Sequence, residues 1–119
     1  MTKTLIKPFE PVATQMCRIG RHRWSVARLI ELSKPLDVMD VPLLHLNIYS
    51  KYENLTLREM AGHFVAARDA DLSFPIILDE DGDIMDGRHR IMKSIIDNKP
   101  TIKAVRFLEN PSPCQVDDD

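Results

Sequence analysis

The sequence contains little cysteine, little tryptophan and no long run of apolar residues. Its two cysteines, Cys17 and Cys114, are far apart in a chain of 119 residues. Two cysteines do not make the framework of a disulfide-rich secreted domain, so we expect free thiols and a cytoplasmic protein. No apolar run approaches the roughly 20 residues of a membrane-spanning helix, and the first residues lack the apolar region of a signal peptide. The sequence therefore predicts no membrane partner.

A strong charge of one sign is also missing. The chain has 16 Lys and Arg residues against 18 Asp and Glu residues, which gives a formal net charge of −2. Sequence-independent binding to nucleic acid depends on a basic surface that displaces counterions, so DNA is not the favoured partner. A hydrophobic content of 44% and a charged content of 29% are typical of a globular protein. The length fits one domain.

The most informative stretch predicts a strand, a turn, a second strand and a helix between residues 76 and 96. The apolar run at 76–78 favours a buried strand, and Asp81-Gly82 is typical of a hairpin turn. The neighbouring aspartates do not have the spacing of a calcium-binding loop and fit turn chemistry. After a short return strand, apolar residues recur with helical spacing: Ile91, Met92, Ile95 and Ile96. Gly87-Arg88-His89-Arg90 is thus predicted where a strand ends and a helix begins.

This position suits an anion. The first turn of a helix has unpaired N–H groups and a partial positive charge, and a glycine there allows a ligand to approach the backbone. Arg88 and Arg90 add charge, while His89 can donate a hydrogen bond or transfer a proton near neutral pH. In the alternative interpretation, Asp86 only caps the helix and the basic side chains are solvated.

The order of these elements resembles the core of the ParB/sulfiredoxin superfamily. The resemblance covers roughly residues 38–108 and includes Asp-Gly-Arg-His-Arg at 86–90 and Ile-Lys-Ala-Val-Arg-Phe at 102–107. It implies a compact α/β (α+β) domain, in which a small mixed sheet carries packed helices. It also implies a nucleotide-phosphate site formed by Gly87, His89 and Arg90, with Arg88 beside them.

The departures from the family narrow the expected activity. Sulfiredoxins have a reactive cysteine where this chain has Arg88, so sulfinic-acid reduction is not expected. Chromosome-partition ParB proteins continue into a helix-turn-helix domain. The roughly thirty residues that follow Gly87-Arg88-His89-Arg90 here leave no room for such a domain. The chain also resembles small kinases of free amino acids in its Asp-Gly-x-His-Arg form. Those kinases depend on ATP or ADP, and the resemblance places Asp86 near Mg²⁺ or the phosphates. The cofactor expected for this chain is ATP or CTP with Mg²⁺.

The resemblance further places a loop and the start of a second helix opposite the phosphate turn. The chemically suitable residues there are Lys51, Glu53, Asn54 and Arg58. Glu53 is suited to act as a general base toward a hydroxyl group, so Asp86, His89 and Glu53 form the predicted catalytic set. The alternative is a solvated polar loop, since polar residues in loops need no special cause.

Other segments carry local predictions. Thr56 and Glu59 form a capping box, and the helix that follows has an apolar stripe expected against the sheet, with His63 structural or exposed on its flank. Residues 38–48 predict a strand in two pieces, broken near Pro42. Ser25 predicts a helix cap, with Trp24 as the anchor of that helix. A second Gly-Arg-His-Arg, at 20–23 just ahead of this helix, is either a coincidence or a second basic patch for a protein partner or a homo-oligomer contact.

Three regions and three functions follow. The expected regions are an N-terminal arm and helix at 1–37, the ParB/sulfiredoxin-like domain at 38–108 and a flexible acidic tail at 109–119. The first function is phosphoryl transfer or nucleotide hydrolysis, which mainly asks a protein for positioning and charge neutralisation. The second is a non-catalytic, nucleotide-responsive interaction module. The third is a DNA-associated ParB-like partition accessory or nuclease.

Overall fold

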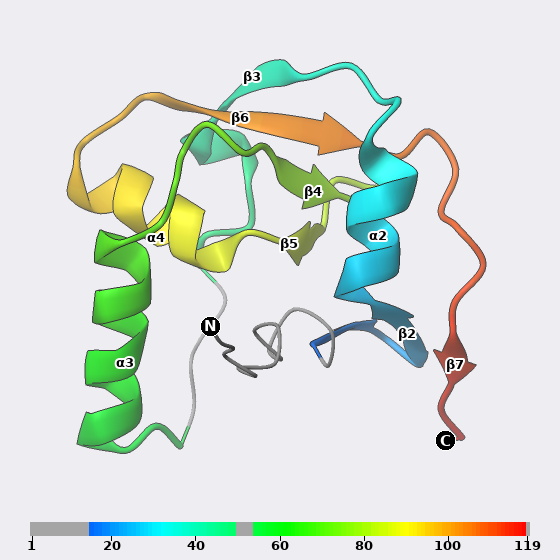
Figure 1. Cartoon of the computed structure of the whole chain (residues 1–119), viewed down its shortest axis with the longest axis horizontal. Coiled ribbons are helices and arrows are strands. Elements are labelled where there is room, and N and C mark those ends of the chain that lie inside the picture. The colour runs from blue at the N-terminus through cyan, green and yellow to red at the C-terminus, as the bar shows by residue number, and fades with distance from the viewer. Residues whose placement is uncertain (1–14, 50–53, 119) are drawn as a thin grey trace, which may run out of the picture.

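The computed structural model describes residues 15–49 and 54–118, which form two sheets and three α-helices (Figure 1). The larger sheet has the order β3-β6-β4-β5, formed by Met39–Pro42, Thr101–Arg106, Ile76–Leu78 and Ile84–Asp86. β6 runs parallel to β4, and the other two neighbouring pairs are antiparallel. The mixed α+β architecture expected from the sequence is therefore present. Within the described residues, no helix is both long enough and apolar enough to cross a membrane.

The turn between β4 and β5 is organised by one buried carboxylate. Asp79 is 2% exposed, and its side chain accepts hydrogen bonds from the backbone N–H groups of Asp81 at 2.9 Å and Asp83 at 2.8 Å. Gly82, at a φ of +89°, donates its N–H to the Asp79 carbonyl at 3.0 Å. The prediction that Asp79 belongs to turn chemistry is confirmed.

The smaller sheet joins the two ends of the described chain. It has the order β1-β2-β7, formed by Met16–Ile19, His22–Ser25 and Gln115–Val116. The Gly-Arg-His-Arg at 20–23 is therefore a hairpin turn and part of a strand, not the start of a helix. Trp24 also belongs to β2 rather than to the helix after it, although it is buried as expected.

Residues 109–118 are held against this sheet instead of forming a loose tail. The indole Nε1 of Trp24 donates to the Pro111 carbonyl at 2.8 Å, and Arg23 Nε pairs with Asp117 at 2.9 Å. The backbone N–H of Cys114 also donates to the Arg23 carbonyl at 2.8 Å. The sequence interpretation failed here because each of these partners lies about ninety residues away along the chain.

Local capping signals were reliable. Helix α2, Val26–Ser33, begins at Ser25, whose side chain accepts from the Arg28 N–H. Helix α3, Leu57–Arg68, has the complete capping box of Thr56 and Glu59. Helix α4, Arg88–Ile96, begins directly after Gly87. The predicted second half of the strand at 38–48 was wrong, because Leu43–His45 form a 3₁₀ turn and Leu44 is 80% exposed.

The apolar residues form two clusters on opposite faces of the larger sheet. β4 supplies Ile77 to one cluster and both Ile76 and Leu78 to the other, as alternation along a strand requires. The first cluster also contains Trp24 and Leu29 from the N-terminal region. Residues 15–37 thus contribute to the same core as the rest of the chain.

Helix α3 does not lie on the sheet. Its one buried residue is Ala67, while Leu57 is 83% and Phe64 is 55% exposed. It packs mainly beside α4 and extends from the body of the molecule (Figure 1). The expectation of an apolar stripe packed against the sheet was therefore wrong.

Candidate functional site

A cavity of about 310 Å³ opens at the start of α4. Its walls come from β1, from β5 and from the first turn of α4, together with Val26 of α2. The cavity contains the predicted turn, since Asp86, Gly87, Arg88, His89 and Arg90 all line it. It also contains residues that the sequence did not indicate: Gln15, Met16, Cys17 and Arg18.

Gly87 gives α4 its starting geometry. The residue is the N-cap of α4 at a φ of +114°, a conformation that side chains rarely adopt. A Cβ at this position would lie 2.8 Å from Cβ of Ile76 in β4 and closer still to its Cγ2. Glycine is thus required for packing of the turn on the sheet. Because glycine has no side chain to cap the helix, the cap leaves the first N–H groups to other partners.

Arg90 links several segments of the site through its hydrogen bonds. Its Nη2 donates to Asp86 Oδ2 at 2.7 Å, and its Nη1 donates to the carbonyls of Pro75 at 2.7 Å and Phe74 at 3.1 Å. These bonds occupy most of the guanidinium donors, and the side chain is 17% exposed. Arg90 therefore joins α4 to the end of β5 and to the segment before β4. This contact fixes Asp86 and Arg90 in place, and it leaves Arg90 little capacity to bind phosphate directly.

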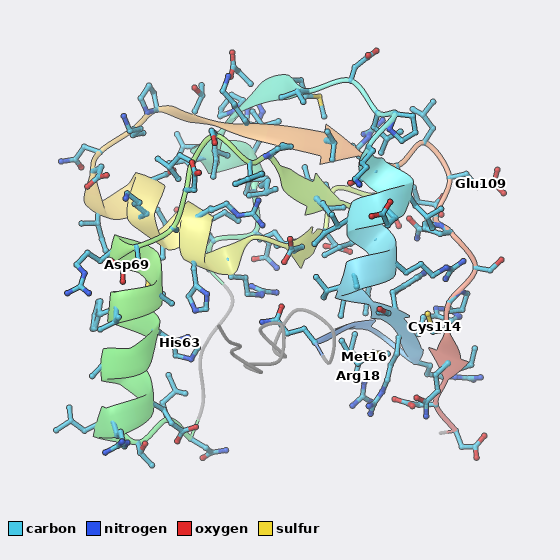
Figure 2. The ribbon with its side chains drawn as sticks, viewed as in Figure 1. Met16, Arg18, His63, Asp69, Glu109 and Cys114 are labelled. Carbon is cyan, nitrogen blue, oxygen red and sulfur yellow. The ribbon has the colours of Figure 1, made fainter. Side chains whose placement is uncertain are left out.

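His89 is paired with another histidine. Its Nε2 lies 2.8 Å from Nδ1 of His63, and the two ring centroids are 5.1 Å apart. His63 points from α3 toward the start of α4 (Figure 2). Burial lowers the pKa of His89, the neighbouring His63 lowers it further, and Asp86 opposes both effects. His89 is accordingly a neutral group near pH 7, suited to donating or accepting a hydrogen bond rather than to supplying charge.

The cationic part of the cavity is formed by Arg88 and Arg18. Arg88 is exposed at the first position of α4, and Arg18 lies across from it on β1. Arg18 is held at the rim by Asp117 at 3.4 Å, which Arg23 shares. Figure 2 shows Arg18 in the N-terminal hairpin, away from α3. Two segments about seventy residues apart thus each contribute an arginine to the lining of one cavity.

Cys17 lies on the floor of this cavity. Burial raises the pKa of its thiol to about 11, and the Arg88 guanidinium opposes that rise only in part. The thiol is thus protonated at neutral pH, which argues against a role as a nucleophile. We interpret Cys17 as a packing residue of the first apolar cluster.

Several predicted site residues lie elsewhere. Asn54 lines a different cavity, beside Met60 and Phe64, and Arg58 is exposed on the first turn of α3. Neither residue belongs to the lining of the α4 cavity. Lys51 and Glu53 lie outside the described residues, so the predicted general base stays a prediction.

The metal prediction receives no support from the described residues. Among them, no group of three His, Cys, Asp or Glu side chains is placed to hold a metal ion. Asp86, the expected ligand, accepts a hydrogen bond from Arg90 instead. The lining residues instead include Arg88 and the first turn of α4, groups of the kind that suit an anion.

Sequence reasoning missed Arg18 and His63. Arg18 reaches the cavity through the β1–β5 contact, which is non-local and has no sequence signal. His63 had a weak signal, since it falls on the flank of an apolar stripe that was assigned to the sheet. The neighbour of α3 is α4, and this difference brings His63 to His89.

The fold and the site together define a small mixed α+β protein with a cationic cavity at a helix N-terminus. Comparisons with models of known families, with curated proteins and with solved structures gave no match. The resemblance of residues 38–108 to the ParB/sulfiredoxin superfamily therefore stays a prediction.

Proposed function

We propose that the cavity at the start of α4 binds the phosphate groups of a nucleotide. The observation that carries this proposal is the meeting of three features in one cavity. These are the glycine-capped N-terminus of α4, Arg88 on its first turn and Arg18 from β1. A helix N-terminus favours an anion, and arginines match phosphate oxygens in geometry and charge.

Each residue has a distinct part in the proposed site. The backbone of residues 88–90 supplies N–H donors, and Arg88 supplies charge that closes over the phosphate. Arg18 is the weaker contributor, because its pairing with Asp117 at 3.4 Å already neutralises part of its charge. Arg90 and Asp86 act as positioning residues, because their ion pair fixes the turn. His89 supplies a neutral hydrogen-bonding group next to the phosphate position.

Phosphoryl transfer is the catalytic extension of the same proposal. Positioning and charge neutralisation are most of what that reaction needs. The described residues include no side chain placed as a general base toward an acceptor apart from Asp86 and His89, both already hydrogen-bonded within the protein. We therefore restrict the proposal to binding, and phosphate release from ATP or CTP with Mg²⁺ tests the extension.

A DNA-binding role has less support in the arrangement of charge. The arginine-rich hairpin at 18–23 is neutralised in part by Asp117, which contacts both Arg18 and Arg23. A basic surface for DNA would need those charges to be available for phosphate contacts.

Titration calorimetry with ATP, CTP and pyrophosphate tests the binding proposal. We expect Arg88→Ala to weaken binding by about 10- to 100-fold, because a charge-assisted hydrogen bond contributes about 1.5–3 kcal/mol. Arg18→Ala should have a smaller effect, since Arg18 lies at the exposed rim. Arg106→Ala is the matched control, because Arg106 is exposed on β6 and does not line the cavity. Equal affinity of Arg88→Ala and the parent for all three ligands would show that the site is wrong.

A further inference from the structure

A second and larger cavity lies beside the first. Its volume is about 690 Å³, and it is bounded by α2, by the residues between α3 and β4, and by one face of the larger sheet. This volume is within the roughly 300–1,000 Å³ of small-molecule sites. Its apolar walls include Ile30, Leu36, Phe74, Ile77 and Val105.

The floor of this cavity is buried and the rim is exposed. Ile77 and Val105 are buried in the sheet, at 3% and 2% exposure. Phe74 is 63% exposed and stands at the opening with Val38. An apolar ligand would thus lie on a packed surface, and it would displace water that finds few hydrogen-bond partners there.

Three of the four charged groups that line the cavity are in ion pairs within the protein, and the fourth, Asp71, is hydrogen-bonded to Ser73. Asp86 is bound to Arg90 at 2.7 Å, and this ion pair faces both cavities. Lys34 pairs with Glu31 at 3.0 Å. Asp71 accepts from the hydroxyl of Ser73 at 2.7 Å and from its N–H at 2.9 Å. A ligand with a net charge would lose its hydration here. It would gain little in return, because each charged group of the lining already has a bonding partner within the protein.

We propose that this second cavity binds an uncharged, mostly apolar small molecule that carries one hydrogen-bonding group. The apolar body lies against the isoleucine, leucine, phenylalanine and valine side chains named above. The polar group is an N–H or O–H that lies at the Asp86–Arg90 ion pair, where the Asp86 carboxylate is the acceptor. Because the lining charges are already in ion pairs or hydrogen bonds and the walls are mostly apolar, the cavity favours an uncharged ligand over an anion or a cation.

Indole is a suitable probe, because it is flat, apolar and has one N–H donor. Titrated into the full chain, it should shift the amide resonances of Ile30, Leu36, Phe74 and Val105 in nitrogen–proton correlation spectra. Indole-3-acetate and tryptamine have the same ring with opposite charges, and both should bind more weakly. Tighter binding of either charged analogue would overturn the proposed ligand class.

Ala70→Phe places an aromatic ring in the cavity and should weaken indole binding by at least about tenfold, because the ring takes the space of the ligand. Ala61→Phe is the matched control at an exposed position of α3. Val38→Trp at the rim provides a second blocking variant if Ala70→Phe does not give a folded spectrum. Unchanged indole affinity in a folded blocking variant, or shifts confined to other residues, would overturn the proposal. Neither result bears on nucleotide binding, since no nucleotide is added.

Discussion

At Gly87 a side chain would meet the β4 strand. The position combines a φ of +114° with a Cβ direction that points at Ile76. Gly87→Ala should therefore lower the free energy of unfolding by about 2–4 kcal/mol, from backbone strain and from overpacking together. Urea denaturation monitored by circular dichroism measures this loss.

Substitutions at two other glycines separate the contribution of backbone strain from that of overpacking. Gly82 also has a positive φ, but a Cβ there would meet nothing within 4 Å, so Gly82→Ala should cost only the backbone term. Gly62 lies within α3, and Gly62→Ala should stabilise the protein by up to about 1 kcal/mol, because alanine is the better helix former. A Gly87→Ala loss no larger than the Gly82→Ala loss would contradict the assigned contact with Ile76.

The residues of the tetrad show how far a sequence motif determines side-chain roles. The motif placed Gly87 to Arg90 correctly at a strand-to-helix junction, because strand and helix periods are local signals. It did not determine which contacts each basic residue makes. Arg90 contacts the carbonyls of Phe74 and Pro75, and this choice depends on a segment about fifteen residues earlier. Arg18 could not be predicted at all.

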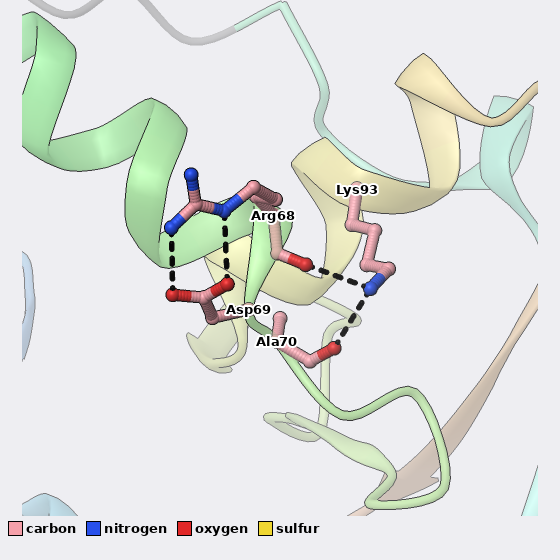
Figure 3. A network of polar contacts seen from close by, with 4 residues as sticks. All are labelled: Arg68, Asp69, Ala70 and Lys93. Carbon is pink, nitrogen blue, oxygen red and sulfur yellow. Dashed lines mark hydrogen bonds and ion pairs between the residues drawn. The ribbon is translucent and has the colours of Figure 1, made fainter.

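At the scale of elements, α3 is attached to α4 at two places. Near its middle, His63 contacts His89. At its C-terminal end, Lys93 Nζ donates to the carbonyls of Arg68 at 2.9 Å and Ala70 at 3.2 Å (Figure 3). The Arg68–Asp69 pair shown beside them is exposed, so it should contribute little. With most of its apolar stripe exposed, α3 is held in position by these polar contacts and by the buried Ala67.

The histidine contact predicts a pH dependence of stability. The pKa of His89 is lowered in the folded state by burial and by His63, so the unfolded chain binds the proton more readily. Stability should then be constant above the unfolded value of about 6.5 and should fall as the pH decreases from there toward the folded pKa. Urea midpoints of the parent and of His89→Gln, measured from pH 7.5 to 5.5, test the prediction.

The difference between the two proteins is the quantity to compare, because the carboxylates titrate in both. His89→Gln should lose less stability over this pH range than the parent. His45→Gln is the control, since His45 is exposed on the 3₁₀ turn and should behave as the parent does. Parallel pH profiles for the parent and His89→Gln would show that His89 does not titrate as inferred.

The helices and strands themselves were predicted better than the elements against which each of them packs. Capping boxes, strand runs and helix periods depend on residues within a few positions, and so α2, α3, α4, β4 and β5 were all expected. The partner of α3 and the pairing of β7 with β2 depend on contacts across the whole chain. An amphipathic stripe predicts that a helix has an apolar face, but it does not predict what covers that face.

For the whole molecule, the two apolar clusters indicate that the described residues unfold as one cooperative unit. They share β4, so loss of this strand would expose both clusters. Trp24 is the one tryptophan of the sequence and is buried between the smaller sheet and α2, whereas α3 and α4 lie at the far side of the larger sheet (Figure 1). Trp24 fluorescence and helical circular dichroism should therefore give the same urea midpoint.

A chain that ends after residue 108 makes this test sharper. It lacks the Pro111 carbonyl that accepts from Trp24, the β7 strand and Asp117. Leaving the buried indole N–H without its acceptor should cost about 1–3 kcal/mol, and cooperativity should lower both midpoints together. Asp118→Asn is the control for the loss of one exposed acidic residue. If only the Trp24 midpoint moved, residues 15–37 and 109–118 would unfold separately, and the shared core would not couple the two sheets.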